Sequence, residues 1–229
     1  MEKITVTIAT QARRRRSLAD TVASLKANTI KPDVIDVYAN DYGLPKRRDL
    51  ADNGKFHNAG YMEGYHLTCD DDLLYPKDYI EKTIAGIEKY GRKAVVGYHG
   101  IVLKPTPIKT YYFDRYIHKC LHGLLLDIPV HILGTGALGY HASVMKLSIS
   151  DFKTPYMADI YFGVAAQKQS VPMICLAHDA DWIKQTRYAN SFVATSIYAK
   201  HRNNHSIQTA VCNELNWQIN KIALPLEKP

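Results

Sequence analysis

The sequence has few cysteines, and none of them lies close to another. It contains four in 229 residues, Cys69, Cys120, Cys175 and Cys212, with no CxxC pair. Closely spaced cysteines would point to a metal or disulfide framework, whereas widely separated ones behave as small buried apolar residues. We therefore expect free thiols in the protein interior and a reducing compartment.

The sequence also has no long hydrophobic run. No stretch is apolar over the roughly 20 residues that a membrane-spanning helix needs. The first residues contain no hydrophobic segment of the kind found in signal peptides. No internal repeat or low-complexity tract is present either. These absences predict a cytoplasmic protein of one domain, which at 229 residues is long enough to bury a sizeable core.

Acidic residues are fewer than basic ones. The formal net charge is +7 and the pI is about 9.1, which favours anionic partners such as nucleotides, phosphorylated lipids, membrane surfaces or nucleic acid. Basic residues cluster at 13–16, 46–48 and 200–202. Because no DNA- or RNA-binding motif accompanies them, a nucleic-acid-binding domain is the non-enzyme alternative rather than the first interpretation.

The most informative stretch is a run of three aspartates, residues 70–72, after a predicted buried strand over 65–69. Pro76 is expected to be the first helical residue of a helix that continues over 77–90. Three adjacent negative charges repel unless a positive charge offsets them. A divalent cation such as Mg2+ or Mn2+ does so through oxygen ligands, and it also binds phosphate oxygens. The alternative is an acidic turn that favours the positive end of the following helix dipole.

Other β-rich runs alternate with helical patterns, as in an α/β protein. Strands are predicted over 4–9, 34–39, 65–69, 94–98 and 171–177, and helices over 17–27, 77–90, 159–169 and 206–222. Ser17 and Asp20 have the spacing of a capping box at the start of the first helix. The carboxyl ends of the strands are where an open α/β sheet binds its ligand.

A glycine motif at 134–139, GTGALG, has the spacing of a dinucleotide-binding fingerprint. The fingerprint belongs in the first βα turn, with an acidic residue ending the next strand. Here the motif comes late, and the acidic residue that follows, Asp159, opens a predicted helix. We therefore expect the glycines to close a tight turn or to let the backbone approach a sugar.

Several short motifs occur in one order over about residues 4–181. They are Asn40-Asp41 after the second strand, 54–56 (GKF), 70–79 (DDDLLYPKDY), Gly134-Thr135-Gly136, 157–160 (MADI) and 176–178 (LAH). In this order they resemble a GT-A type glycosyltransferase, close to the family 2-like enzymes of bacterial polysaccharide and capsule assembly. The aspartate stretch is the most specific of these motifs.

The resemblance implies a single α/β domain of the Rossmann-like GT-A kind. Its central sheet would be mixed but mostly parallel, with helices on its flanks and a further helix at the C-terminus. Residues 1–181 would form the nucleotide-sugar-binding and catalytic core. Residues 182–229 would form a mobile loop and the C-terminal helix, packed on the same domain.

The resemblance also implies roles for individual residues. The general base of an inverting transfer would be Asp159; many family members have an acidic pair there, and this chain has Ala158 at the first position. A metal ion, Mn2+ or Mg2+, would be held by Asp70, Asp72 and His178. The position of the metal ligands within the triplet stays open, because a DxDD alignment favours Asp71, and His178 has a capping or core role as its alternative. Substrate-binding roles fall to Thr10, Arg13, Asp41, Lys55, Asp70, Asp71, Gly136 and Arg202.

The implied reaction moves a sugar from a nucleotide-diphosphate sugar to an acceptor hydroxyl. The acceptor would be a glycan or lipid-linked glycan in cell-surface polysaccharide synthesis, with no nucleic-acid partner. The loop over 180–200 would close over the donor and exclude water. The basic chain and its terminal helix also predict weak, salt-sensitive contact with the inner face of an anionic membrane.

A sugar nucleotidyltransferase is the second enzyme interpretation. Such enzymes share much of this sheet and also use Mg2+. They usually carry a glycine-rich loop with Arg and Lys after the first strand. This chain has the sequence Thr-Gln-Ala-Arg at 10–13, with the Arg but without a glycine. The glycosyltransferase interpretation is therefore preferred.

Overall fold

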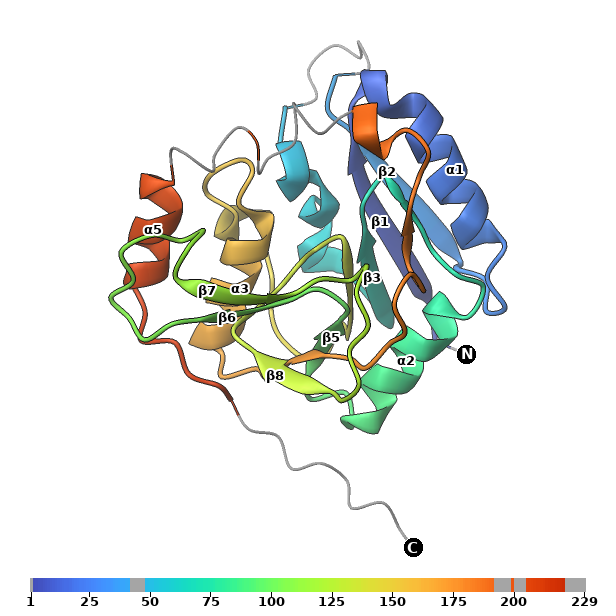
Figure 1. Cartoon of the computed structure of the whole chain (residues 1–229). Helices are drawn as coiled ribbons and strands as arrows, with labels where there is room; N and C mark the ends of the chain where they lie inside the picture. Colours follow the sequence, from blue (N-terminus) through green and yellow to red (C-terminus); the bar gives the residue numbers. More distant parts are fainter. Residues whose placement is uncertain (1, 42–47, 192–198, 200–204, 221–229) are drawn as a thin grey trace, which may run out of the picture.

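The computed structural model describes residues 2–41, 48–191, 199 and 205–220 (Figure 1). A seven-stranded sheet in the order β2-β1-β3-β10-β5-β11-β8 forms its centre. The strands of this sheet are β1 (Ile4–Thr10), β2 (Val34–Ala39), β3 (Tyr65–Cys69), β5 (Val95–Gly97), β8 (Ile128–Val130), β10 (Ala137–His141) and β11 (Met173–Cys175). The helices are α1 (Arg15–Lys26), α2 (Tyr79–Lys89), α3 (Ala158–Lys168) and α5 (Ser206–Asn213).

The central sheet is mixed but mostly parallel. β1 pairs in parallel with β2 and β3, and β5 pairs in parallel with β11. β10 is antiparallel to both β3 and β5, between which it lies, and β8 is antiparallel to β11. Together with the flanking helices, this confirms the predicted α/β domain. Because β10 runs against β3, its first residues lie beside the last residues of β3, where the aspartates begin.

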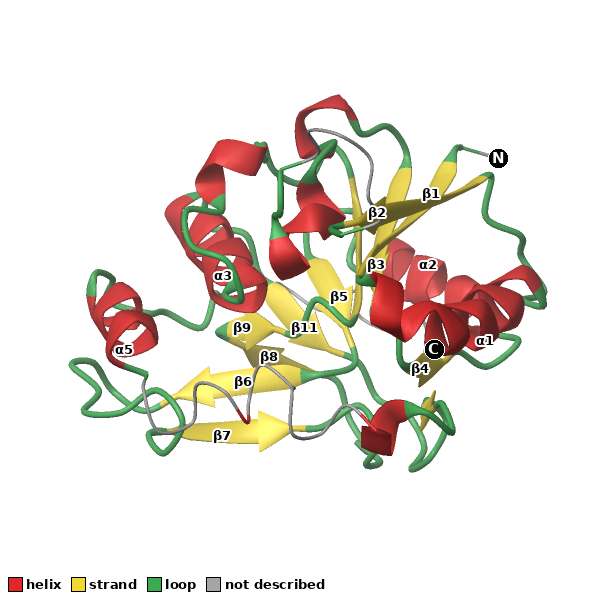
Figure 2. Ribbon diagram, turned by 90° about the horizontal axis from the view of Figure 1, so that it is seen from above, coloured by secondary structure: helices red, strands yellow, loops and turns green. Residues whose placement is uncertain are grey.

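The sheet is covered on both faces by apolar side chains. α1 and α2 lie on one face and α3 on the other (Figure 2). Neighbouring residues of β5 show the alternation that a strand imposes: Val95 packs with the α3 layer, and Val96 with the α1 and α2 layer. The predicted strands therefore form a sheet with a hydrophobic core on each face. This packing holds the carboxyl ends of β1, β3 and β5 in fixed positions.

Two smaller sheets are attached to this core. One has the order β7-β6-β9 and consists of β7 (Arg115–His118), β6 (Gly100–Leu103) and β9 (Ile132–Leu133). The other pairs β4 (Leu73–Leu74) with β12 (Lys184–Gln185). β6 and β7 lie to one side of the central sheet, on the same side as α5 (Figure 2). This places a second wall opposite the ends of the central strands.

The first two helices begin differently from the prediction. Pro76 is not helical, because residues 73 and 74 are held in β4 and the helix starts only after Asp78. Ser17 does not cap α1; the helix has begun at Arg15, and the buried Ser17 hydroxyl shares a hydrogen bond with the Thr186 hydroxyl at 2.7 Å. Both starts are set by contacts with the distant segment around β12.

The last helix is shorter than predicted. It ends at Asn213 instead of continuing to 222. The Trp217 indole N–H donates to the Cys212 carbonyl at 2.7 Å and so takes an acceptor that a continuing helix would use for its own backbone. Trp217 is buried, and its ring lies where a side chain on Gly163 would meet it. Docking on α3 therefore ends α5.

The remaining predictions concern the membrane, the C-terminal part of the chain and the cysteines. Within the described ranges, no helix is long and apolar enough to cross a membrane. The predicted loop over 180–200 and the end of the predicted C-terminal helix fall partly outside those ranges, and the boundary at residue 181 stays a prediction. All four cysteines are buried free thiols, as expected.

Candidate functional site

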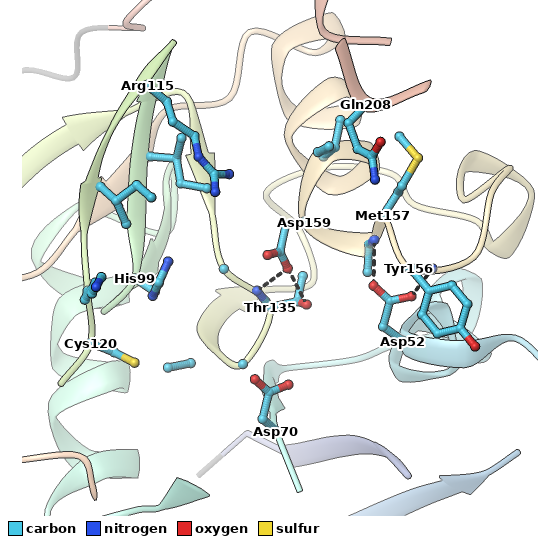
Figure 3. Close-up of a pocket in the computed structure, with 18 of the residues that line it drawn as sticks. Asp52, Asp70, His99, Arg115, Cys120, Thr135, Tyr156, Met157, Asp159 and Gln208 are labelled. Carbon is cyan, nitrogen blue, oxygen red and sulfur yellow. Dashed lines mark hydrogen bonds between the residues drawn. The ribbon is translucent and has the colours of Figure 1, made fainter. Parts of the chain in front are cut away.

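A cavity of about 510 Å3 lies between the ends of the central strands, the start of α3 and the wall formed by β6 and β7 (Figure 3). Its lining combines acidic and basic side chains from both halves of the chain. The charged residues are Asp52, Lys55, Asp70, Arg115, Lys119 and Asp159. Of the predicted site residues, Lys55, Asp70, Gly136 and Asp159 meet here, which makes this cavity the candidate active site.

Two cations of the protein itself neutralise part of the aspartate triplet. Lys55 forms an ion pair with Asp70. Arg14 pairs with Asp71 and lies 3.2 Å from Asp72. The repulsion that suggested a metal ion is therefore partly offset in the protein alone, which the sequence interpretation had not anticipated.

Lys55 is buried below the cavity, with a side chain only 4% exposed. Its Nζ also donates to the Thr135 carbonyl at 3.1 Å. Burial by itself would lower the pKa of Lys55, but the negative charges of Asp70, Asp159 and Asp52 outweigh it and raise that pKa. Burial would likewise raise the pKa of Asp70, and Lys55 reverses this. Both groups are thus held in their charged forms.

Asp70 and Asp72 each keep one oxygen that receives no hydrogen bond from the described residues, Oδ2 and Oδ1 respectively. Their side chains are 45% and 25% exposed. Burial, together with the charge of Asp70, raises the pKa of Asp72 to about 6. Two exposed carboxylate oxygens that repel each other suit a hard divalent cation whose remaining ligands are phosphate and water. The residues present therefore fit such an ion.

The backbone around Gly136 fixes the direction of Asp70. The Tyr75 hydroxyl accepts from the Asp70 backbone N–H at 2.8 Å and donates to the Gly136 carbonyl at 2.5 Å. A Cβ on Gly136 would collide with the Asp70 carboxylate. Gly136 thus permits a close approach of the Asp70 carboxylate, while the approach of a sugar stays a prediction. The segment after Gly136 enters β10 rather than a helix. The GxGxxG motif at 134–139 is therefore not a dinucleotide-binding fingerprint.

Asp159 lies in the first turn of α3 and faces the cavity. Its Oδ1 accepts two hydrogen bonds from Thr135, one from the backbone N–H at 2.8 Å and one from the hydroxyl at 2.7 Å. Its Oδ2 receives none from the described part of the chain. An anchored carboxylate with one oxygen directed into a cavity has the arrangement that a general base needs.

Asp52 holds the beginning of α3 in place. Its two oxygens accept from the backbone N–H groups of Tyr156 at 2.6 Å and Ala158 at 3.0 Å. Burial raises the pKa of Asp52 to about 6, against the effect of these hydrogen bonds, and the charge of Asp159 adds to the rise. Sequence reasoning did not single out Asp52, whose only local signal was its position beside the GKF run.

Other predicted substrate-binding residues lie outside the cavity lining. Thr10 donates to Asp71 Oδ2 at 2.6 Å, Asp41 accepts from the Ala12 backbone N–H at 2.6 Å, and exposed Arg13 donates to the Gln11 side chain at 2.9 Å. They gather near the ends of β1, β2 and β3, and a nucleotide bound along this edge stays a prediction. Arg202 lies outside the described residues.

The histidine in the cavity is His99, not the predicted His178. His178 lines a separate hollow with Lys82 and Leu125. Across the described residues, no group of three or more His, Cys, Asp or Glu side chains is placed to hold a metal ion. His99 lies two residues after the end of β5, and that position near a strand end was the signal that could have identified it. Burial lowers the pKa of His99, although Asp159 and Asp70 act in the opposite direction.

Comparison with known proteins gives distant structural likenesses only. A197 from STIV matches with a TM-score of 0.43 and 13% identity over 80% of this chain and 84% of that one. S. aureus TarS 1-349 matches with a TM-score of 0.49 and 10% identity over 83% of this chain and 62% of that one. S. aureus TarS matches with a TM-score of 0.47 and 10% identity over 89% of this chain and 43% of that one. The chain thus spans less than two thirds of either TarS structure. Likenesses at this level say nothing of what the chain binds or catalyses. No protein-family model and no curated protein matches the chain.

Proposed function

We propose that the chain is a glycosyltransferase that moves a sugar from a nucleotide-diphosphate sugar to an acceptor hydroxyl, with inversion. One observation carries the proposal: Asp159, anchored through one oxygen only, lines the same cavity as the Lys55–Asp70 pair. This arrangement supports a base for the acceptor and a charged group for the leaving diphosphate around one space. Glycan or lipid-linked glycan acceptors of cell-surface polysaccharide synthesis are the substrates we propose.

In this mechanism the free oxygen of Asp159 takes the proton from the acceptor hydroxyl as that hydroxyl attacks the anomeric carbon. Thr135 keeps the carboxylate turned toward the cavity through its two hydrogen bonds. Lys55, whose charge is maintained by the surrounding carboxylates, contributes positive charge near the bond that breaks. Preorganised charge of this kind stabilises the negative charge that develops on the leaving group.

Asp70 and Asp72 would hold a divalent cation, Mn2+ or Mg2+, through their exposed oxygens. When bound, the ion supplies further positive charge to the departing diphosphate. Lys55 and Arg14 already neutralise part of the triplet, so the aspartates do not need the ion in order to lie together. We therefore expect the ion and the nucleotide to bind together, with phosphate oxygens completing the coordination.

The function is tested by the thermal stability of the full chain against a panel of nucleotide sugars. A ligand that binds the folded state raises the unfolding free energy by about 2.7 kcal/mol at one hundred times its dissociation constant. We expect one nucleotide sugar to raise the melting temperature in Mn2+ and to raise it far less in excess EDTA. A panel in which no nucleotide sugar stabilises the chain would overturn the proposed function.

Metal binding is expected to weaken as the pH falls. Because burial and Asp70 raise the pKa of Asp72 to about 6, protons compete with the cation near that pH. Titration of Mn2+ by calorimetry should show affinity falling severalfold between about pH 7.5 and about pH 5.5. Asp72→Asn should bind weakly and show little of this pH dependence. Wild-type affinity that stays constant over the range would rule out Asp72 as a ligand.

A further inference from the structure

One wall of the cavity carries positive charge that no carboxylate of the described residues neutralises. Arg115 and Ile117 are alternate residues of β7, and Lys119 follows at the same spacing just beyond it. Alternate residues of an extended segment share a face, and all three line the cavity. Neither Arg115 nor Lys119 makes an ion pair with any residue that the structure describes.

Two aromatic rings fix the position of Arg115. The centre of its guanidinium group lies 4.2 Å from the ring centroid of Tyr111 and 4.7 Å from that of Tyr112. The side chain extends from β7 toward the middle of the cavity (Figure 3). Cation–π contacts of this kind hold a guanidinium group while leaving its N–H groups, which lie in the plane of the guanidinium itself, available for hydrogen bonds.

The buried Nε of Arg115 has no hydrogen-bond partner in the described structure. A buried donor without an acceptor is destabilising, more so on a charged group. Arginine presents its N–H groups as a planar fork that matches the two oxygens of a carboxylate or phosphate. The unpaired donor therefore indicates that the acceptor of this hydrogen bond arrives with a ligand.

The charge on this wall acts on the same interior space as the candidate base. Burial is the main cause that lowers the pKa of His99, and both Arg115 and Lys119 lower it further. Asp159 and Asp70 act on the same ring in the opposite direction. In the view of Figure 3, Asp159 lies between Arg115 and Asp70. The cavity thus has a cationic wall with Arg115 on one side of Asp159 and the carboxylate of Asp70 on the other.

We propose that Arg115, assisted by Lys119, binds an anionic group of the acceptor, a phosphate or a carboxylate. This inference rests on the proposed function and names the substrate class of that same site. The donor diphosphate belongs at the Asp70 and Asp72 end, with the divalent ion. An acceptor anchored through its anionic group at the opposite wall would present a hydroxyl to Asp159 in between. A neutral acceptor would leave the Arg115 fork without a partner.

The Nε–H resonance of Arg115 provides a direct test in the full chain. The resonance is assigned as the one missing from the arginine Nε–H spectrum of Arg115→Lys. Inorganic phosphate, glucuronate and glucose are then titrated into the wild-type protein. We expect saturable shifts with phosphate or glucuronate, the stronger of which identifies the anionic group, and none with glucose. An Arg115 resonance that neither anion shifts would overturn the proposal.

Variants separate this site from other basic positions. Arg115→Gln should weaken binding of the effective anion about tenfold, whereas Arg16→Gln, on the exposed surface of α1, should leave it unchanged. Arg115→Lys, which keeps the charge but not the fork, should fall between the two. Equal affinity in the wild type and Arg115→Gln would place the anion elsewhere and contradict the assignment.

Competition identifies the substrate to which the anionic group belongs. The effective anion and the nucleoside diphosphate of the stabilising donor should bind together; mutual displacement would assign Arg115 to the donor and overturn the proposal. If no nucleotide sugar stabilises the wild type, the proposed function fails, and the acceptor assignment fails with it. If a donor stabilises but neither anion shifts Arg115, the inference fails alone.

Discussion

Asp159→Asn is expected to lower turnover by about 10²–10⁴-fold while leaving donor affinity nearly unchanged. The reason lies in the two oxygens of this carboxylate. Oδ1 accepts both hydrogen bonds from Thr135, and an asparagine oxygen can take over that position. The amide nitrogen then replaces the oxygen that faces the cavity, and it cannot accept a proton from the acceptor. The variant therefore removes the base without removing the anchor.

The measurement compares turnover with donor binding in the same preparation. Asp179→Asn serves as the matched control, because Asp179 is exposed and lines the separate hollow beside His178. Asp159→Asn should show the wild-type melting temperature and the wild-type stabilisation by donor. Near-normal turnover, or a product that retains the anomeric configuration of the donor, would show that Asp159 is not the base of an inverting transfer.

The sequence predicted the fold well where the signals are local. The second and third strands begin and end where the β-rich runs 34–39 and 65–69 begin and end. Alternation and turn residues act within a few positions of the sequence. Burial on both faces strengthens the signal of β3, all of whose residues are buried. The ends of α1, α2 and α5 were less predictable, because each is set by residues far away in the chain, such as Thr186, Trp182 or Gly163.

The site was predicted in part for the same reason. Asp70 and Asp159 could be chosen because each belongs to a short motif at the end of a strand or the start of a helix. The pairing of Lys55 with Asp70, and the presence of His99 rather than His178 in the cavity, depend on which segments meet in space. The sheet order places β10 between β3 and β5, and no local pattern specifies that order.

The cationic wall was missed because no strand was predicted over residues 115–118. β7 is four residues long, and its outward side includes the exposed Tyr116, so it lacks the apolar run that marks a central strand. The signal that was present is the alternation of Arg115, Ile117 and Lys119. Such a pattern acquires a meaning only when a cavity is known to face it.

Lys55→Met is expected to be among the most destabilising substitutions at the site. The variant keeps most of the aliphatic stem but removes the charge that lies among Asp70, Asp159 and Asp52. Removing one partner of a buried ion pair lowers the unfolding free energy by about 3–5 kcal/mol. Because the Asp70 side chain is 45% exposed, water replaces part of the lost interaction, and we expect the lower end of this range.

Urea unfolding of the full chain measures this difference. Lys146→Met, on an exposed lysine, should change stability by less than about 0.5 kcal/mol. The double variant Lys55→Met/Asp70→Asn should recover part of the loss, since it removes the uncompensated carboxylate as well. The interaction free energy from this cycle is the contribution of the pair, provided that neither single variant creates a new contact.

The pH dependence distinguishes lost charge from lost packing. Lys55 lowers the pKa of Asp70, so its stabilising effect is complete above the unfolded-state pKa of about 3.9 and disappears as the pH falls through the folded-state value. In Lys55→Met the buried Asp70 carboxylate loses its cation, so burial raises its pKa and it takes up a proton at a higher pH than in the wild type. The loss caused by Lys55→Met should therefore be large near neutral pH and smaller near about pH 4. A loss of equal size at both values would mean that the stem of Lys55 stabilises the fold by packing, and that its charge is not what holds the carboxylates of the cavity together.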